Sequence, residues 1–280
     1  MAYTLDDQIP AGELADWWRT SVIDIEPGAI RPRGYAIETL IGTISFPAMI
    51  WLMLRGELPT PAQSRLLEAT LVAGVDHGPH APSIAIARMA STCGIGVNGA
   101  MASAINVLGD VHGGAGQACL ALYERVIARL ARGEPLADAA SAEVDAALAD
   151  GGLIPGFGHR FHPVDPRAGK LLALVDAAHQ AGEVAGRHAA VARAVETALA
   201  RRKGKRLPMN IDGATAAVHG ELGFAPELAR GLFVLSRSVG ILSHAWEQMN
   251  TSARIKGPMP PQVPYRYTGA APRQTEPGHE

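Results

Sequence analysis

The stretch "QACLALYERVIARLAR", residues 117–132, decides the fold class. Its apolar side chains recur every three or four residues, which is typical of an α-helix that buries one face. The same spacing recurs in residues 137–149, 168–182 and 185–202. Apolar–polar alternation with β-branched and aromatic residues, which is typical of strands, is scarce. The sequence therefore predicts an all-α protein.

Glycine and proline mark the ends of the predicted helices. The breaks fall at Gly133-Glu134-Pro135, Gly151-Gly152 and Gly204. Upstream, residues 46–75 predict a helix, a turn with glycine, and a second helix that begins at Thr60-Pro61, an N-cap followed by proline. From Gly257 onward the chain is rich in proline and glycine, which predicts an extended arm or tail.

The composition is that of an ordinary globular protein. The 280-residue chain is 48% hydrophobic and 19% charged, with a net charge of −2, so it has no basic field for nucleic acid or an anionic membrane. Two cysteines are too few for a disulfide framework or a Cys-based zinc site. Neither a signal-peptide pattern nor an apolar run of membrane-spanning length is apparent. We therefore expect a cytoplasmic protein.

A polar segment, "GFGHRFHPVDPRA" at residues 156–168, interrupts the helical pattern. His159 lies in its glycine-rich part, where the backbone can approach a ligand closely. Asp165 precedes the next helix and is read as an N-cap. Arg167 lies in the first helical turn, where the helix dipole disfavours a cation, and this indicates an anionic partner for Arg167.

Three further segments carry polar groups between helices. His77 and His80 have the spacing of a metal pair but lack a third ligand nearby in the sequence, so a helix-end loop and a ligand contact stay open. His112, followed by two glycines, is either a capping residue or a neutral hydrogen-bond donor beside a helix N-terminus. Asp212 precedes an alanine-rich run, where an N-cap is the simplest interpretation.

The last predicted helix, "GLFVLSRSVGILSHAWEQMN" at residues 231–250, carries a polar face among apolar residues. Arg237, His244 and Gln248 share one face, and most other positions are apolar. A buried cation needs an acidic ligand or side chain.

Two histidines in loops, an aspartate at a helix start and two arginines together suit carbon–carbon bond chemistry beside a carbonyl. The carboxylate takes a C–H proton, neutral donors hold an enolate oxygen, and arginines bind carboxylates.

This set of residues, in this order, resembles the citrate synthase family, over most of residues 33–269. The motifs that carry the resemblance are "RGYAIETLIGTISFPAMIWLMLRGELPT", "HGGA", "PGFGHRFHPVDPRA", "NIDG", "SRSVGILSHAWEQ" and "PYRYTG". The resemblance implies an all-α fold and a homodimer. It implies a large domain of residues 1–116 and 204–280 with a C-terminal arm, and a small domain of residues 117–203.

The resemblance also implies a role for each matching residue. Asp212 is the base at the acetyl-CoA methyl group, His112 donates to the enolate oxygen, and His159 polarises and protonates the oxaloacetate carbonyl. The binding residues are Arg167 and Arg237 at the substrate carboxylates, His77 at the oxoacid, and Gly156, Phe157 and Gly158 against coenzyme A. Coenzyme A thioesters, acetyl-CoA and citryl-CoA, are then substrates, with a dicarboxylic 2-oxoacid as partner. No tightly bound cofactor and no metal are expected.

Two departures from the family pattern bear on the activity. Only sixteen residues separate Pro59 from Asp76, fewer than in family synthases, and Gly257 occupies the place of a tail arginine. Arg254, Lys256 and Arg266 are candidates to replace that arginine. The short chain and the "NIDG" motif resemble citryl-CoA lyases and the lyase module of ATP citrate lyase more closely than they resemble synthases. In those lyases the same residues would cleave citryl-CoA to acetyl-CoA and oxaloacetate, the reverse of the synthase condensation. The alternatives are a citrate synthase, a synthase for another 2-oxoacid, and a non-catalytic homologue that binds coenzyme A or a carboxylate.

Overall fold

The computed structural model describes residues 16–149, 152–159 and 162–274. These residues form two units, each described separately. The larger unit comprises the described parts of residues 1–76 and 108–239, and the smaller unit those of 77–107 and 240–280. One helix, α12 (Pro226–Met249), contributes to both units. The large and small domains expected from the sequence are a different division of the chain, and their boundaries stay a prediction.

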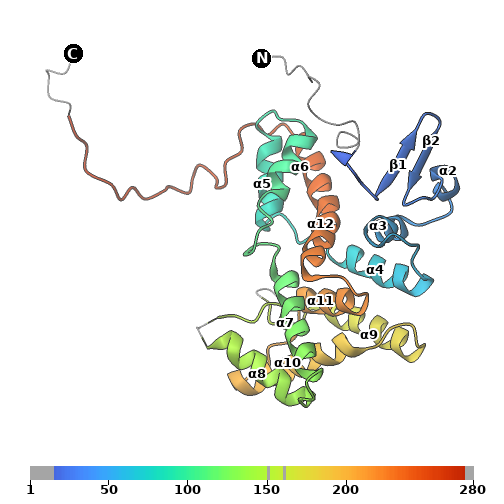
Figure 1. Ribbon diagram of the computed structural model, residues 1–280. Coiled ribbons are helices and arrows are strands. Elements are labelled where there is room, and N and C mark those ends of the chain that lie inside the picture. Colours follow the sequence, from blue (N-terminus) through green and yellow to red (C-terminus); the bar gives the residue numbers. More distant parts are fainter. Residues whose placement is uncertain (1–15, 150–151, 160–161, 275–280) are drawn as a thin grey trace, which may run out of the picture. The chain divides into compact units, whose positions relative to one another are not determined.

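The predicted all-α fold is confirmed, since helices make up most of the larger unit (Figure 1). Its helices besides α12 are α2 (Ile37–Leu40), α3 (Phe46–Arg55), α4 (Pro61–Ala73), α7 (Ala115–Leu130), α8 (Leu136–Leu148), α9 (Pro166–Gln180), α10 (Arg187–Lys203) and α11 (Ile211–Glu221). The four helical stretches predicted from apolar spacing are α7 to α10, and their ends differ from the prediction by one or two residues. Thr60 caps α4 as predicted, through a capping box with Gln63.

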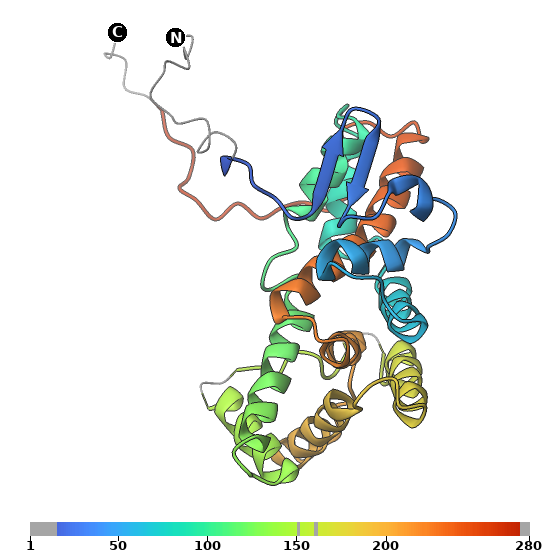
Figure 2. The same ribbon diagram turned by 45° about the vertical axis from the view of Figure 1, so that its right-hand side comes forward.

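A short β-hairpin precedes α2 and was not predicted (Figure 2). Strands β1 (Ile23–Glu26) and β2 (Ala29–Pro32) pair antiparallel, with Ile25 opposite Ile30. Gly28, with a φ of 79°, makes the turn between them. Strands of four residues are too short for apolar alternation to stand out in a sequence window.

Helix α11 is the centre of the larger unit and packs against α4, α7, α9 and α10. Most of its residues are buried, and most of these are alanine or glycine. Small side chains allow four neighbouring helices to approach the backbone of α11 closely. The buried His219 contacts the Thr70 hydroxyl at 3.1 Å, and burial lowers the pKa of His219 to about 4, so this imidazole is neutral at pH 7.

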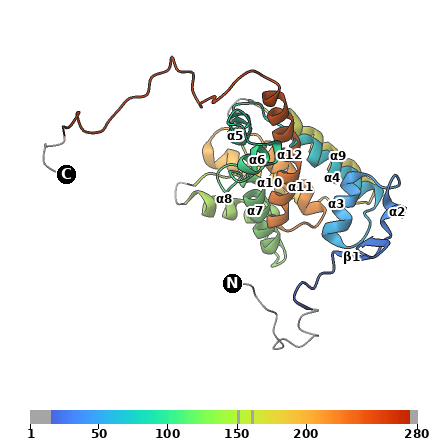
Figure 3. The ribbon, with the colours of Figure 1, turned by 90° about the horizontal axis from the view of Figure 1, so that it is seen from above.

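The smaller unit contains α5 (Pro82–Ser91), α6 (Val97–Ile105) and the end of α12. The Thr92 carbonyl accepts a hydrogen bond from the Ile255 amide at 3.0 Å, and its hydroxyl accepts one from the Lys256 amide at 2.9 Å. Residues 257–274 then contain neither helix nor strand, as predicted for the tail (Figure 3). Among the described residues, no helix has the length and apolarity needed to cross a membrane.

Candidate functional site

The N-terminus of α11 carries Asp212, the predicted base. Asn210 caps this helix: its side-chain oxygen accepts hydrogen bonds from the amides of Asp212 at 2.9 Å and Gly213 at 3.4 Å. Burial raises the pKa of the Asp212 carboxyl, the charges of Arg167 and Arg237 oppose that rise, and Asp165 adds to it. The net effect is a raised pKa, which makes Asp212 a stronger base than an ordinary aspartate.

The glycine loop, residues 156–158, lies against the chain that leads into α11. The Gly158 amide donates to the Pro208 carbonyl at 2.7 Å, and the Asn210 amide donates to the Gly156 carbonyl at 2.9 Å. Gly156 has a φ of 87°, and a Cβ there would lie 2.6 Å from the Cys119 sulfur. Only glycine fits that position, because a side chain would meet both backbone strain and a buried sulfur.

Asp165 connects the segment that carries His159 to the start of α11. Its side chain is fully buried and accepts hydrogen bonds from Arg167 Nε at 2.9 Å, Arg167 Nη2 at 2.8 Å, and the amides of Arg167 and Ile211. Burial alone would raise the pKa of Asp165, but these bonds lower it to about 2. Asp165 is therefore the predicted N-cap of α9 and also the anionic partner that the position of Arg167 indicated.

Arg237 lies on α12, within the larger unit, and is 6% exposed. Its Nε donates to the Gly74 carbonyl at 3.2 Å, and its guanidinium lies 5.0 Å from the ring centre of Phe233. Burial lowers the pKa of Arg237, and the carboxylates of Asp76 and Asp212 act in the opposite direction. The buried cation thus has acidic side chains near it, as its position in an apolar helix predicted.

His112 lies in the turn before α7 and is partly buried. Burial and the positive charge of Arg237 both lower the pKa of His112, so its imidazole is neutral at pH 7. The sequence predicts a neutral His112 from the nearby helix N-terminus. The structure adds two further causes, the burial of the imidazole and the charge of Arg237. Gly114 follows in the same turn, where a Cβ would lie 2.6 Å from the Asp110 carbonyl oxygen.

His159 follows the glycine loop, and its Nδ1 accepts a hydrogen bond from the His162 amide at 3.0 Å. In the neutral imidazole this bond places the proton on Nε2, which makes Nε2 a donor. Burial lowers the pKa of His159, Asp165 opposes this, and the charges of His162 and Arg167 lower it further. His159 is therefore neutral at pH 7.

The larger unit contains most of the predicted site residues: His112, Gly156, Phe157, Gly158, His159, Arg167, Asp212 and Arg237. His77 belongs to the smaller unit, in the exposed loop before α5, together with His80. In residues 16–149, 152–159 and 162–274, no three His, Cys, Asp or Glu side chains are grouped to hold a metal ion. Arg160, which adjoins His159 in the motif, lies outside the described residues.

The predicted polar face of α12 divides between the two units. His244 contacts Arg88 at 3.0 Å and lies 3.7 Å from Glu247, and the buried Gln248 donates to the Thr251 hydroxyl at 2.8 Å. These partners belong to the smaller unit itself. His244 and Gln248 thus have protein partners in the described structure, so their place on the polar face does not by itself require a ligand.

Sequence reasoning missed two buried residues beneath the site. The Tyr123 hydroxyl donates to the Gly213 carbonyl at 3.3 Å and also bonds to Cys119, one helical turn away on α7. Burial raises the pKa of the Cys119 thiol to about 12, so Cys119 stays protonated at pH 7. Both residues lie in the helical pattern of residues 117–132, and helical spacing alone does not identify what a buried polar atom contacts.

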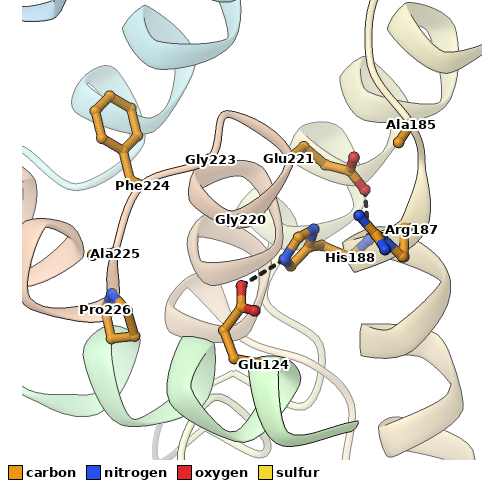
Figure 4. Close-up of a pocket in the computed structure, with 10 residues that line it drawn as sticks. All are labelled: Glu124, Ala185, Arg187, His188, Gly220, Glu221, Gly223, Phe224, Ala225 and Pro226. Carbon is orange, nitrogen blue, oxygen red and sulfur yellow. Dashed lines mark hydrogen bonds and ion pairs between the residues drawn. The ribbon is translucent and has the colours of Figure 1, made fainter. Parts of the chain in front are cut away.

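A separate hollow lies at the far end of α11, lined by residues of α7, α10 and α11 (Figure 4). Its polar lining includes Arg187, the Glu124–His188 pair, at 2.8 Å, and the Glu221 carboxylate. Glu221 accepts hydrogen bonds from the amides of Gly186, His188 and Ala189, and so caps the start of α10, whose own N-cap is a glycine. These contacts give the polar residues of the hollow a structural role.

Known proteins resemble this chain over the whole predicted site. The family model for the C-terminal domain of citrate synthase matches residues 59–258. The citrate synthase of Acidithiobacillus ferridurans is 28% identical over 240 residues, which are 84% of this chain and 58% of that protein. The citrate synthase of Deinococcus radiodurans is 31% identical over 193 residues, 67% of this chain and 48% of that protein. The chain thus spans about half the length of these relatives.

Solved structures add a second kind of relative. A citryl-CoA lyase from Hydrogenobacter thermophilus superposes with a TM-score of 0.82 at 32% identity, covering 92% of this chain and 97% of that chain. An ATP citrate lyase from Methanothrix soehngenii, in complex with citrate and coenzyme A, has a TM-score of 0.73 at 20% identity and covers 94% of this chain and 45% of that one. The second match is a likeness of fold alone.

Proposed function

The chain belongs to the citrate synthase family, and on that premise we propose that it cleaves citryl-CoA to acetyl-CoA and oxaloacetate. The observation that carries this proposal is the match to the citryl-CoA lyase of Hydrogenobacter thermophilus, which extends over 97% of that chain. The curated citrate synthases instead have about half of their length outside the match.

Three side chains move the protons and hold the charge in this reaction. The hydroxyl proton of citryl-CoA passes to His159, and the carbon–carbon bond breaks to leave the oxaloacetate ketone. The bond's electron pair moves to the thioester oxygen as an enolate, to which neutral His112 donates. Asp212 then returns a proton to the terminal carbon, which becomes the methyl group of acetyl-CoA. Its raised pKa favours the protonated form that this step consumes.

The hydrogen bond at His159 Nδ1 bears on the direction of the reaction. The observed contact from the His162 amide favours the tautomer with a proton on Nε2, which can donate to a ketone oxygen. In cleavage Nε2 must be free to accept the hydroxyl proton, so the contact from the His162 amide opens and the neutral imidazole carries its own proton on Nδ1. By microscopic reversibility, synthesis passes through the same states in reverse: the imidazolium formed in cleavage returns its Nε2 proton to the ketone oxygen.

The remaining predicted residues bind substrate in this proposal. Arg167 and Arg237 hold the carboxylates, His77 contacts the oxoacid part, and the glycine loop lies against coenzyme A. Arg167 is held in place for this task by Asp165. Coenzyme A thioesters act as substrates, and no tightly bound cofactor is required. The large and small domains and the cytoplasmic location expected from the sequence belong to the same proposal.

Citrate synthesis is the second candidate, because the curated relatives at 28% and 31% identity carry that name. A synthase for another 2-oxoacid is the related alternative, which Gly257 in place of a tail arginine favours.

The experiment supplies the purified protein with citryl-CoA and follows oxaloacetate, citrate and coenzyme A thiol together. Oxaloacetate without thiol supports the lyase, whereas citrate with thiol supports the hydrolytic half-reaction of a synthase. If no product forms, other 2-oxoacids are tested with acetyl-CoA. Failure of all of these leaves the non-catalytic binding protein.

A further inference from the structure

The geometry points to Asn210 as a positioning residue that holds Asp212 and the glycine loop in one fixed arrangement. This inference rests on the proposed function, because it assigns Asn210 a part in the same site. Its side chain contacts the two segments that the reaction needs side by side, the helix that carries the acid–base aspartate and the loop that lies against coenzyme A.

The two ends of the Asn210 amide serve different segments. The side-chain oxygen accepts from the Asp212 and Gly213 amides, and the side-chain nitrogen donates to the Gly158 carbonyl at 2.7 Å. The neighbours fix this orientation, because the reversed amide would place its NH₂ against two N–H groups and its oxygen against a carbonyl. One planar group therefore completes the helix N-terminus and secures the loop.

Capping alone does not require asparagine at this position. Serine, threonine and aspartate cap helices about equally well, and Ser45, Thr60 and Asp165 do so elsewhere in this chain. None of these side chains combines an acceptor for the helix with an NH₂ donor for a carbonyl on the other side. The bond to Gly158, across 52 residues of sequence, is the contact that distinguishes asparagine here.

The start of α11 has a second support in Asp165, and the glycine loop is also held by two backbone hydrogen bonds, from the Gly158 amide to Pro208 and from the Asn210 amide to Gly156. Asp165 accepts from the Ile211 amide at 2.9 Å, so α11 stays anchored if the Asn210 side chain is shortened. A variant that keeps the cap and loses the donor to Gly158 therefore loosens mainly the Gly158 end of the loop. Small displacements at a reacting centre cost large factors in rate or affinity, about 100-fold for roughly 1 Å.

The test compares Asn210→Ser, which retains a capping oxygen, with Asn210→Ala, which loses both functions. We expect N210S to raise the KM for citryl-CoA about tenfold or more, with a smaller fall in kcat and a Tm within about 2 °C of wild type. N210A lowers the Tm and kcat as well. The matched control is Thr60→Ala, which removes the N-cap of α4 and lowers the Tm with no change in KM or kcat.

An N210S variant with wild-type KM and kcat would overturn the inference, and so would a T60A variant with an equal rise in KM. If the wild-type chain turns over no substrate, the proposed function fails and hydrogen–deuterium exchange tests Asn210 separately. N210S should then speed amide exchange in residues 156–158 by about tenfold or more while residues 61–73 keep their protection. Unchanged protection of residues 156–158 would refute the positioning role.

Discussion

Asp212 and His159 have pKa values displaced in opposite directions by their surroundings. Burial raises the pKa of Asp212, and burial lowers that of His159. The proposed cleavage uses Asp212 in its protonated form and His159 as a neutral imidazole, since the carboxyl gives a proton and the imidazole takes one. Arg167 and Arg237 limit the rise at Asp212, so that the carboxyl can also ionise and act as a base in the reverse direction.

Replacing Asp212 with asparagine tests the acid–base role. D212N keeps the shape of the side chain and the cap from Asn210, so the fold and the binding of coenzyme A thioester are expected to persist. Because the variant cannot exchange a proton, kcat for citryl-CoA cleavage should fall by roughly 10²- to 10⁴-fold. Steady-state kinetics and the thermal shift caused by acetyl-CoA check both expectations. Equal rates in variant and wild type would contradict the acid–base role of Asp212.

Replacing Asp165 with asparagine tests the buried ion pair with Arg167. Removing one partner of a buried pair leaves an uncompensated charge, so the unfolding free energy at pH 7 should fall by about 3 kcal/mol. The folded pKa of Asp165 is lowered from 3.8 to about 2, so this stabilisation is complete above the unfolded value and is lost as the pH falls through about 2. Urea unfolding of wild type and D165N from pH 7 down to pH 2 should show that the difference between their unfolding free energies becomes smaller as the pH falls. A difference that is constant with pH contradicts the assignment.

At the scale of elements, α11 connects the site to the rest of the larger unit. Its N-terminus carries Asp212, and its C-terminal Glu221 caps α10. Its glycines allow neighbours to approach: a Cβ on Gly220 would lie 2.1 Å from the ring of His188, and one on Gly213 would lie 2.5 Å from the Gly156 carbonyl oxygen. The position of Asp212 therefore depends on tight packing along the whole helix.

Two glycine-to-alanine variants measure this packing. Gly220→Ala forces the buried His188 ring away from Glu124 and should lower the unfolding free energy by about 2 kcal/mol. Gly169→Ala, in α9, is the matched control, because nothing lies within 4 Å of a Cβ there. Alanine favours the helix, so G169A should raise the unfolding free energy by about 0.5 kcal/mol. Urea denaturation of the two variants checks the contrast, and similar effects would disprove close packing at Gly220.

At the scale of the whole molecule, one face of α12 carries an exposed apolar stripe. Leu235, Val239, Leu242 and Trp246 are 46%, 55%, 44% and 63% exposed, and their spacing of four, three and four residues places them on one side of the helix. Leu235 and Val239 belong to the larger unit and Leu242 and Trp246 to the smaller one, and exposed apolar side chains of this kind are typical of a surface that meets another protein. The family resemblance implies a homodimer, and we expect a second copy of this chain to cover these side chains of α12.

A charge placed in this stripe should weaken the dimer. Trp246→Glu buries a carboxylate without a partner if the stripe is covered, so the dimer dissociation constant should rise at least about 100-fold. Val72→Glu, at an exposed position of α4, is the control and should leave the oligomeric state unchanged. Sedimentation velocity over a range of concentrations measures both. A monomeric wild-type chain, or a W246E variant that dimerises like wild type, contradicts the assignment.

The sequence by itself determined the helices, the cap at Thr60, and an anionic partner for Arg167. These features depend on residues within one or two helical turns, so apolar spacing and capping chemistry identify them. The β-hairpin was not identified, because its four-residue strands are too short to show apolar alternation. The roles of the predicted site residues stay predictions that the experiments above test.

Tertiary structure alone decided which groups meet across the chain. It brought the Ile211 amide to the Asp165 carboxylate, joined Asn210 to Gly158, and set Glu221 at the start of α10. It also placed the charge of Arg237 where it lowers the pKa of His112. Such contacts join residues far apart in sequence, and their geometry follows from how whole helices pack around α11. Local propensity and spacing contain no information about that packing.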